Sequence, residues 1–171
     1  MNTTTGNLTT VAGKGTFGYS GDGALATNAE LGTVSQVAVD AAGNIYFTDS
    51  YYNVVRKITA TTGIINTIAG SPAGTAGYGG NGGLATGALL NAPNGLAVDN
   101  AGNIYIGDEG NNYIRKIDGT GIINNFAGNG AAGVTVYCGA ATATSFKSVT
   151  SIAVDLNGNV YFTDALYNRV N

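Results

Sequence analysis

One phrase is written three times in this chain: VAVDAAGNIYFTD at residues 37–49, LAVDNAGNIYIGD at 96–108 and IAVDLNGNVYFTD at 152–164. The first aspartates of successive copies are separated by 59 and then 56 residues. A repeat of this length, made of short apolar runs between glycine-rich turns, is typical of proteins that stack small structural units. The self-similarity therefore predicts a repeat architecture before any single residue is considered.

Each repeat has the pattern of four short strands. In the first copy, the apolar runs 37–39 and 45–48 flank residues 40–44, whose Asp, Gly and Asn favour the tight turn of a hairpin. Two further runs rich in β-branched residues follow at 54–58 and 64–68. The three- and four-residue spacing of an amphipathic helix is missing from these runs. The pattern predicts an all-β fold, a β-propeller made of four-stranded antiparallel blades.

Composition supports a turn-dense β protein and argues against other classes. Glycine accounts for 28 of 171 residues, and 44% of the chain is hydrophobic with a formal net charge of −3, which is unlike a disordered chain. The seven basic residues are scattered, so no patch suited to nucleic acid is expected. No apolar run reaches the roughly 20 residues of a membrane span. The lysine-poor, Gly- and Thr-rich composition favours a secreted or cell-surface protein.

Three features occur together and in register: the Ala-Val-Asp-x-x-Gly-Asn-x-Tyr core of each copy, the Asn-x-x-Arg-Lys-Ile strands at 53–58 and 112–117, and the Tyr-Ser-Gly-Asp-Gly linker at 19–23. This combination resembles the NHL-repeat family of β-propellers, of the bacterial, extracellular type, over essentially the whole chain. The resemblance implies a propeller, commonly of six blades, that serves as a binding or scaffolding platform. Similar propellers include lyases that depend on histidine and a metal, and the absence of histidine here argues against that activity.

The ends of the chain divide one blade between them. Residues 1–13 match residues 58–70, whereas residues 168–171 stop partway through a third strand. We therefore expect three blade-equivalents, half of a six-blade ring, within a single NHL-type propeller segment at 1–171. The approximate repeats are 7–63, 64–121 and 122–171.

Two explanations of these ends stay open. A second copy of the chain could close the ring head-to-tail, with the outer strand at 7–12 of each copy completing the split blade of the other. The chain could instead be an excerpt of a longer protein. Three blades alone are too few for a ring, since propellers have about four to eight.

The acids at equivalent repeat positions have a structural explanation. Asp40 and its equivalents open hairpin turns, and we expect Asp49 and its equivalents to cap turn amides or to pair with arginines of the third strand. The functional alternative is Ca²⁺, which prefers carboxylate and carbonyl oxygens, but Asp22 lacks the spacing of a calcium loop. No catalytic residue, metal ligand or cofactor is assigned. Cys138 has no histidine to activate it and is expected to be structural.

Aromatic and amide side chains are predicted to gather on one face of the blades. Because the strands alternate in direction, the turn between the second and third strands lies on the same face as the linker that leads into each blade. Tyrosine offers rigid, amphipathic contact area that suits the recognition of protein, peptide or glycan. The predicted binding residues are Tyr51, Tyr52, Glu109, Asn111 and Tyr167 from the turns and Tyr19 and Tyr78 from the linkers, with Phe17 and Tyr113 beside them.

Three functions follow from these observations. The first is a non-enzymatic binding or scaffolding module that recognises protein, peptide or glycan through this face. The alternative is a propeller lyase or hydrolase that uses acidic residues or a divalent metal at the ring centre, which convergent carboxylates would favour. The third is an architectural element whose edge strands join copies of the chain into a ring or fibre.

Overall fold

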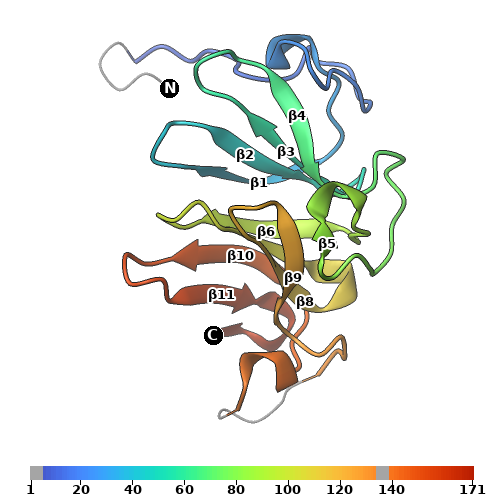
Figure 1. Ribbon diagram of the computed structural model, residues 1–171, viewed down its shortest axis with the longest axis vertical. Helices are drawn as coiled ribbons and strands as arrows, with labels where there is room; N and C mark the ends of the chain where they lie inside the picture. Colours follow the sequence, from blue (N-terminus) through green and yellow to red (C-terminus); the bar gives the residue numbers. More distant parts are fainter. Residues whose placement is uncertain (1–5, 134–138) are drawn as a thin grey trace.

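The chain folds into three antiparallel sheets that follow one another along the sequence (Figure 1). The structure, a computed structural model, describes residues 6–133 and 139–171. Each sheet corresponds to one copy of the repeated phrase, and consecutive strands within it are hydrogen-bonded neighbours. The predicted all-β fold of antiparallel propeller blades is confirmed.

The strands are grouped into three blades. Blade 1 contains β1 (Val34–Val39), β2 (Ile45–Asp49), β3 (Val54–Ile58) and β4 (Ile65–Ala69). Blade 2 contains β6 (Pro93–Val98), β7 (Ile104–Asp108), β8 (Tyr113–Ile117) and β9 (Ile122–Ala127), with the short β5 (Gly83–Leu84) added at its outer edge. Blade 3 contains β10 (Val149–Val154), β11 (Val160–Asp164) and β12 (Arg169–Val170).

Within residues 6–133 and 139–171, the helices are single 3₁₀ turns. Three of them lie in the linkers that precede the blades, and two follow the second strands of blades 2 and 3. Among the described residues, no helix is long and apolar enough to span a bilayer. The linker turns are η1 (Ala26–Asn28), η2 (Ala85–Gly87) and η4 (Ala141–Ala143), and the others are η3 (Glu109–Asn111) and η5 (Ala165–Tyr167).

The hairpin turn inside each repeated phrase is held by its first aspartate. Asp40 Oδ1 accepts hydrogen bonds from the amides of Ala42 at 3.0 Å and Asn44 at 2.8 Å, and its Oδ2 accepts from the Tyr46 hydroxyl at 2.9 Å. Desolvation acts to raise the pKa of Asp40, but the hydrogen bonds from Asn44, Tyr46 and Ala42 hold it below its ordinary value. Asp99 and Asp155 make the same contacts, so the turn role expected from the sequence is confirmed.

The hydrophobic core lies between the blades. The inner strands β1, β6 and β10 lie side by side (Figure 1), and the sheets face one another across them. One buried cluster joins Tyr46 and Val55 of blade 1 to Leu90 and Leu96 at the start of blade 2. A second joins blade 2 to blade 3 around Phe146. A sheet with two apolar faces is stable only between two neighbours, which is why the repeats depend on one another.

The linkers that lead into blades 1 and 2 pair with the outer strands of those blades. The Ala26 amide donates to the Gly63 carbonyl at 2.8 Å, and the Ile65 amide donates to the Ala24 carbonyl at 3.0 Å. In blade 2 the equivalent contact is regular enough to form β5, which pairs with β9. The linker thereby forms hydrogen bonds with backbone N–H and C=O groups that the outermost strand would otherwise leave unpaired.

The outer strand expected at residues 7–12 is not formed within the single chain. Residues 7–11 have no strand structure, and the side chains of Leu8 and Val11 are exposed. The strand that they were expected to extend, β12, lies at the other end of the molecule and has one strand neighbour, β11 (Figure 1). Three blades in a row keep the two ends apart, so this pairing cannot occur inside one copy.

Candidate binding face

In each blade, a buried aspartate at the end of the second strand holds the linker that leads into the blade by hydrogen bonds to its side chain. Asp49 Oδ2 accepts a hydrogen bond from the Gly32 amide at 2.7 Å, and Asp49 Oδ1 accepts one from the Tyr52 amide at 3.2 Å. The equivalent aspartates of blades 2 and 3 accept from the linker amides of Asn91 at 2.8 Å and Lys147 at 3.2 Å. Asp49 thus caps a turn amide, as the sequence predicts, and the strand-end aspartates of all three blades cap linker amides.

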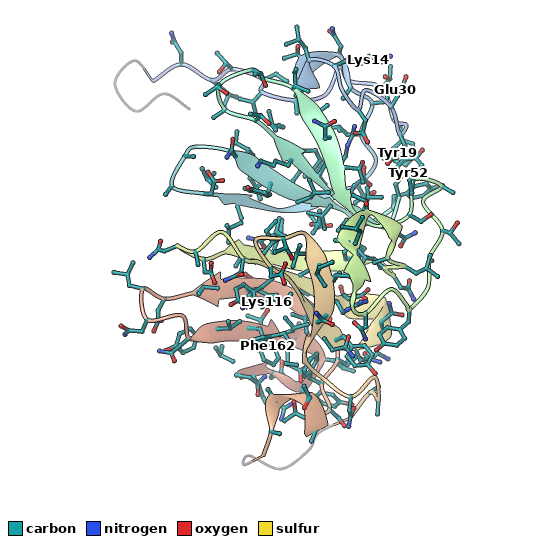
Figure 2. The ribbon with its side chains drawn as sticks, viewed as in Figure 1. Lys14, Tyr19, Glu30, Tyr52, Lys116 and Phe162 are labelled. Carbon is teal, nitrogen blue, oxygen red and sulfur yellow. The ribbon has the colours of Figure 1, made fainter. Side chains whose placement is uncertain are left out.

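Four aromatic rings form one cluster on blade 1. The Phe17 ring lies edge-on to Tyr51, with 4.8 Å between the ring centroids, and Tyr51 lies edge-on to Tyr52 at 5.0 Å. Tyr19 stacks on Tyr52 at 5.4 Å, and Figure 2 shows these two side chains next to each other at the edge of the molecule. Phe17 and Tyr51 are the exposed members, whereas Tyr19 and Tyr52 are half-buried. The turn and the linker thus meet as the sequence predicted.

A fully buried arginine supports this cluster from below. The Arg56 guanidinium lies 2.6 Å from Asp22 Oδ1 and donates to the carbonyls of Ser20 at 2.9 Å and Glu30 at 3.2 Å. It also lies over the Tyr19 ring, 5.3 Å from its centroid. The expected pairing of a strand-end aspartate with a third-strand arginine is therefore absent from blade 1, where Arg56 binds the linker. It is present in blade 2, where Arg115 lies 3.4 Å from Asp108. The Arg-Lys pairs at 56–57 and 115–116 were the signal for this position in the sequence.

Blade 2 carries a smaller aromatic group. Tyr78 and Tyr113 are stacked with centroids 4.7 Å apart, and Arg115 lies 5.3 Å from the Tyr78 centroid. The Tyr78 hydroxyl accepts hydrogen bonds from Asn125 Nδ2 at 2.7 Å and Asn81 Nδ2 at 3.0 Å. Burial acts to raise the pKa of Tyr78, but these hydrogen bonds and the Arg115 charge lower it overall. Tyr78 is therefore fixed in place rather than free to adapt.

Glu109 lies where blades 2 and 3 meet. Its Oε2 accepts a hydrogen bond from Asn94 Nδ2 at 3.0 Å, and its Oε1 accepts one from the Ser148 hydroxyl at 2.8 Å. Asn94 belongs to the inner strand of blade 2, and Ser148 immediately precedes that of blade 3. The carboxylate therefore bridges two blades close to their inner strands, with both oxygens in use.

Asn111 and Tyr167 occupy equivalent turn positions but have different surroundings. Asn111 Nδ2 donates to the Gly77 carbonyl at 2.7 Å and to Asp108 Oδ2 at 2.8 Å, so its amide is used to hold the linker. Tyr167 lies beside Arg169, whose guanidinium carbon is 5.6 Å from the ring centroid. Neither residue contacts the aromatic cluster of blade 1.

The seven predicted binding residues therefore do not form one continuous site. Linkers and turns pack within their own blade, so each blade carries a separate group of side chains. The structure brings together Tyr19, Tyr51 and Tyr52, with Phe17, on blade 1, and places Tyr78, Glu109 and Asn111 on blade 2 and Tyr167 on blade 3.

The acidic residues do not converge. Across residues 6–133 and 139–171, no group of three or more His, Cys, Asp or Glu side chains could hold a metal ion. Asp22, the aspartate most like a calcium-loop residue in the sequence, is paired with Arg56. Cys138 lies outside the described residues.

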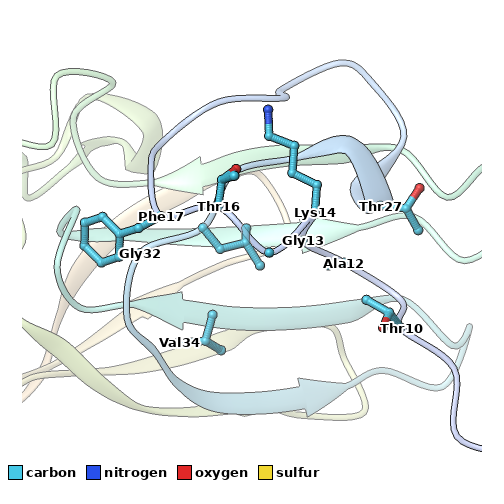
Figure 3. A pocket seen from close by; sticks show the side chains of 11 residues that line it. Thr10, Ala12, Gly13, Lys14, Thr16, Phe17, Thr27, Gly32 and Val34 are labelled. Atoms are coloured by element: carbon cyan, nitrogen blue, oxygen red, sulfur yellow. The ribbon is translucent and has the colours of Figure 1, made fainter.

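A hollow on the open side of blade 1 was not identified from the sequence. Its volume is about 890 Å³, and its walls combine the N-terminal segment, the linker and the first strand (Figure 3). Ala12, Phe17, Leu31 and Val34 give it an apolar lining, with Thr10, Thr16 and Thr27 at its edges. It has no counterpart inside the repeat array because a preceding blade fills the equivalent space there.

Comparison with known proteins supports the repeat assignment. The family described as the teneurin NHL domain matches residues 72–136. A chloroplast protein of Arabidopsis thaliana, SUPPRESSOR OF QUENCHING 1, is 40% identical over 76 residues, which are 44% of this chain and 7% of that protein. This chain thus corresponds to a small part of that relative.

Solved structures share the fold over most of the chain. A protein of unknown function from Bacteroides thetaiotaomicron is 26% identical with a TM-score of 0.64, covering 75% of this chain and 31% of that chain. An auxiliary nutrient binding protein of the same organism is 18% identical with a TM-score of 0.61, covering 78% and 35%.

Enzymes occur among the structural neighbours as well. A gluconolactonase from Xanthomonas campestris is 17% identical with a TM-score of 0.52, covering 77% of this chain and 34% of its own. A streptogramin B lyase is 14% identical with a TM-score of 0.51, covering 81% and 39%. At these identities the likeness concerns the fold alone. This chain spans about a third of the length of these structural neighbours. Its three blades have the β-propeller fold, with repeats of the NHL type.

Proposed function

We propose that this chain is a non-enzymatic binding module that recognises an apolar segment of a partner protein or peptide. The observation that carries the proposal is the pair Phe17 and Tyr51, each 61% exposed although their rings are in edge-on contact at 4.8 Å. Two large rings held rigidly at the surface lose little conformational entropy when a partner covers them, and aromatic anchors of this kind dominate many protein interfaces.

The polar surroundings of the pair favour a protein over a glycan. A sugar requires directional hydrogen-bonding groups beside the ring. Here Arg56 is committed to the linker, the Tyr19 hydroxyl shares a hydrogen bond with Thr67 at 2.8 Å, and Asn53 donates to the Gly74 carbonyl at 3.0 Å. An apolar side chain makes no such demand, so the surface offers it the better match.

The enzyme alternative has less support from the geometry. Glu109 lies close to the inner strands of blades 2 and 3, and hydrogen bonds from Asn94 and Ser148 occupy both of its oxygens. The turn aspartates are engaged by their own backbone amides. Structural neighbours with this fold include both enzymes and a nutrient-binding protein, so the fold is compatible with either class. A secreted or cell-surface location, where such modules meet their partners, is part of the proposal.

Selection from a phage-displayed random peptide library against the purified chain tests this proposal. Peptides selected on the wild type should bind the double variant Phe17→Ala, Tyr51→Ala at least about 30-fold more weakly, which corresponds to the loss of about 2 kcal/mol at an aromatic anchor. Leu156→Ala is the matched control because Leu156 is also a large exposed apolar residue but lies in the hairpin turn of blade 3. Selected peptides that bind the double variant as tightly as the wild type would refute the proposal. So would binding to a glycan array with no peptide selected.

A further inference from the structure

The two members of the Arg-Lys pair in blade 1 have different surroundings. Arg56 is fully buried and binds the linker, whereas Lys57, which follows it in β3, is half-buried. In the part of the chain that the structure describes, no acidic side chain forms an ion pair with Lys57. Its ammonium lies over the Tyr46 ring, 5.3 Å from the centroid. An ammonium above an aromatic ring keeps hydrogen-bond donors free for a further partner.

Lys57 and Tyr46 line a groove between blades 1 and 2. The volume of the groove is about 330 Å³, near the lower end of the range of roughly 300–1,000 Å³ that is usual for small-molecule sites. Blade 1 forms one wall, and blade 2 with β5 and η2 forms the other. The groove offers an aliphatic surface as well as the lysine. The other apolar side chains along it are Ile68, Leu84, Ile104 and Ile117, of which Leu84 is 63% exposed.

Asp118 places the opposite charge in the same groove. It directly follows β8 and opens the turn to β9. Its Oδ1 accepts hydrogen bonds from the Thr120 hydroxyl at 2.6 Å and from the amides of Thr120 at 2.9 Å and Ile122 at 3.1 Å. These hydrogen bonds hold the pKa of Asp118 below its ordinary value, so the carboxylate is charged at neutral pH.

The two charges of the groove are not used on each other. Among residues 6–133 and 139–171, Asp118 forms no ion pair, and the hydrogen bonds that it accepts end on Oδ1 and leave Oδ2 without a partner. A ligand with a carboxylate alone would face the repulsion of Asp118, and one with an ammonium alone would face that of Lys57. The charges therefore match a small molecule that carries both groups.

We propose that the groove between blades 1 and 2 binds a free amino acid with a large aliphatic side chain, such as leucine. The ligand carboxylate accepts a hydrogen bond from the Lys57 ammonium, and the ligand ammonium donates one to Asp118 Oδ2. Both hydrogen bonds join charged groups, which makes them stronger than neutral ones. The aliphatic side chain is covered by the isoleucines and by Leu84, which supplies the apolar part of the affinity.

The groove is separate from the aromatic pair of the proposed function. Tyr51 lies in the turn between β2 and β3, whereas Asp118 and Gly119 lie in the turn between β8 and β9, and Gly102 lies in the turn between β6 and β7. Because the strands alternate in direction, these two kinds of turn are at opposite ends of the blades. Amino-acid binding in the groove therefore does not rest on peptide recognition by Phe17 and Tyr51.

Titration of the isotope-labelled chain with L-leucine, followed by heteronuclear NMR, tests the proposal. Leucine should bind with a Kd of about 1 mM or below, the range expected for so small a ligand. The amide signals of Gly102, Gly119 and Gly121, which line the groove, should shift and saturate together. Gly158 is the equivalent of Gly102 in blade 3 and lies outside the groove, so its signal should stay in place.

Ligands that lack one part of leucine test each contact without changing the protein. Isocaproate is leucine without its ammonium, isoamylamine is leucine without its carboxylate, and glycine lacks the aliphatic side chain. Each should bind at least about 10-fold more weakly than leucine. Isocaproate or isoamylamine that binds as tightly as leucine would overturn the proposal, because one of the two charges would then be unnecessary.

Two substitutions test the protein side of the same contacts. Lys57→Met and Asp118→Asn should each weaken leucine binding at least about 10-fold, and asparagine retains an oxygen for the hydrogen bonds of the turn. Lys116→Met is the matched control for the lysine, because Lys116 lies 5.4 Å from the Tyr105 centroid in the same way but does not line the groove. Asp155→Asn is the control for the aspartate, since Asp155 Oδ1 also holds a hairpin turn.

Three results decide the matter. The two control variants and the double variant Phe17→Ala, Tyr51→Ala should bind leucine with the wild-type Kd, so that peptide binding and leucine binding can fail separately. Absence of any saturable shift of the three glycine amides would overturn the proposal. A wild-type Kd for leucine in Lys57→Met would overturn it as well.

Discussion

Leu31 and Leu90 are leucines at equivalent repeat positions. Comparing their substitution by alanine measures how much packing between blades contributes to the stability of the chain. Leu90 is fully buried in the cluster between blades 1 and 2, whereas Leu31 lines the hollow on the open side of blade 1. We expect Leu90→Ala to destabilise the chain much more than Leu31→Ala.

The magnitude follows from the atoms removed. Truncating leucine to alanine removes three carbons, worth about 2.4 kcal/mol at roughly 0.8 kcal/mol for each buried group. The cavity left among Leu96, Ile106 and Val55 adds to this, for a total of about 3 kcal/mol. Leu31 already faces open space, so no new cavity forms and its loss costs about 1 kcal/mol.

Thermal unfolding followed by circular dichroism is the assay, at a protein concentration where the chain is monomeric. At roughly 2–4 °C per kcal/mol for a chain of this size, Leu90→Ala should lower Tm by about 6–12 °C and Leu31→Ala by about 2–4 °C. Equal losses of Tm for the two variants would refute the reasoning, because they would mean that contact between blades does not determine the stability of a repeat.

Three further substitutions test the buried network and the turns. Burial raises the pKa of Asp108 to about 6, above its ordinary 3.8, so its contribution to stability is present at low pH and is lost as pH rises to about 6. Asp108→Asn should abolish about 3 kcal/mol of this pH dependence in urea unfolding, and an unchanged slope would contradict the assignment. Gly70→Ala should lower the free energy of unfolding by about 2 kcal/mol more than Gly102→Ala. Both glycines have positive φ, but only at Gly70 does the new Cβ collide with the Asn53 carbonyl. Similar Tm values for the two variants would contradict this prediction. In Arg115→Lys, the lysine cannot reproduce the guanidinium contacts with Gly79 and Asn81, so the tyrosine signal in near-ultraviolet circular dichroism should weaken. A wild-type signal would show that the stack of Tyr78 on Tyr113 does not depend on these contacts.

Sequence and structure agree most closely where the causes are local. The alternation of β-branched residues with Asp-x-x-Gly-Asn turns predicts the hairpins, and Asp40, Asp99 and Asp155 hold those turns with bonds that span two to six residues. Repetition of the same phrase predicts three similar sheets stacked in order. The aromatic residues of the turn and the linker in blade 1 were also placed on one face by the direction of the strands alone.

The parts that sequence could not predict depend on contacts between distant segments. Arg56 could have paired with Asp49, and only the path of the linker brings Asp22 to its guanidinium instead, across 34 residues of chain. Five of the seven expected binding residues are tyrosines, but tertiary packing separates the seven by blade and leaves Tyr51 exposed beside Phe17. Burial of the inner strands also depends on tertiary contacts. Val37 and Leu96 occupy equivalent repeat positions, but only Leu96 is buried, because another blade packs against it. The sequence thus determined the strands and turns of each blade. The tertiary structure decided which surfaces of each blade are covered, because hydrophobic burial depends on which residues are neighbours in space.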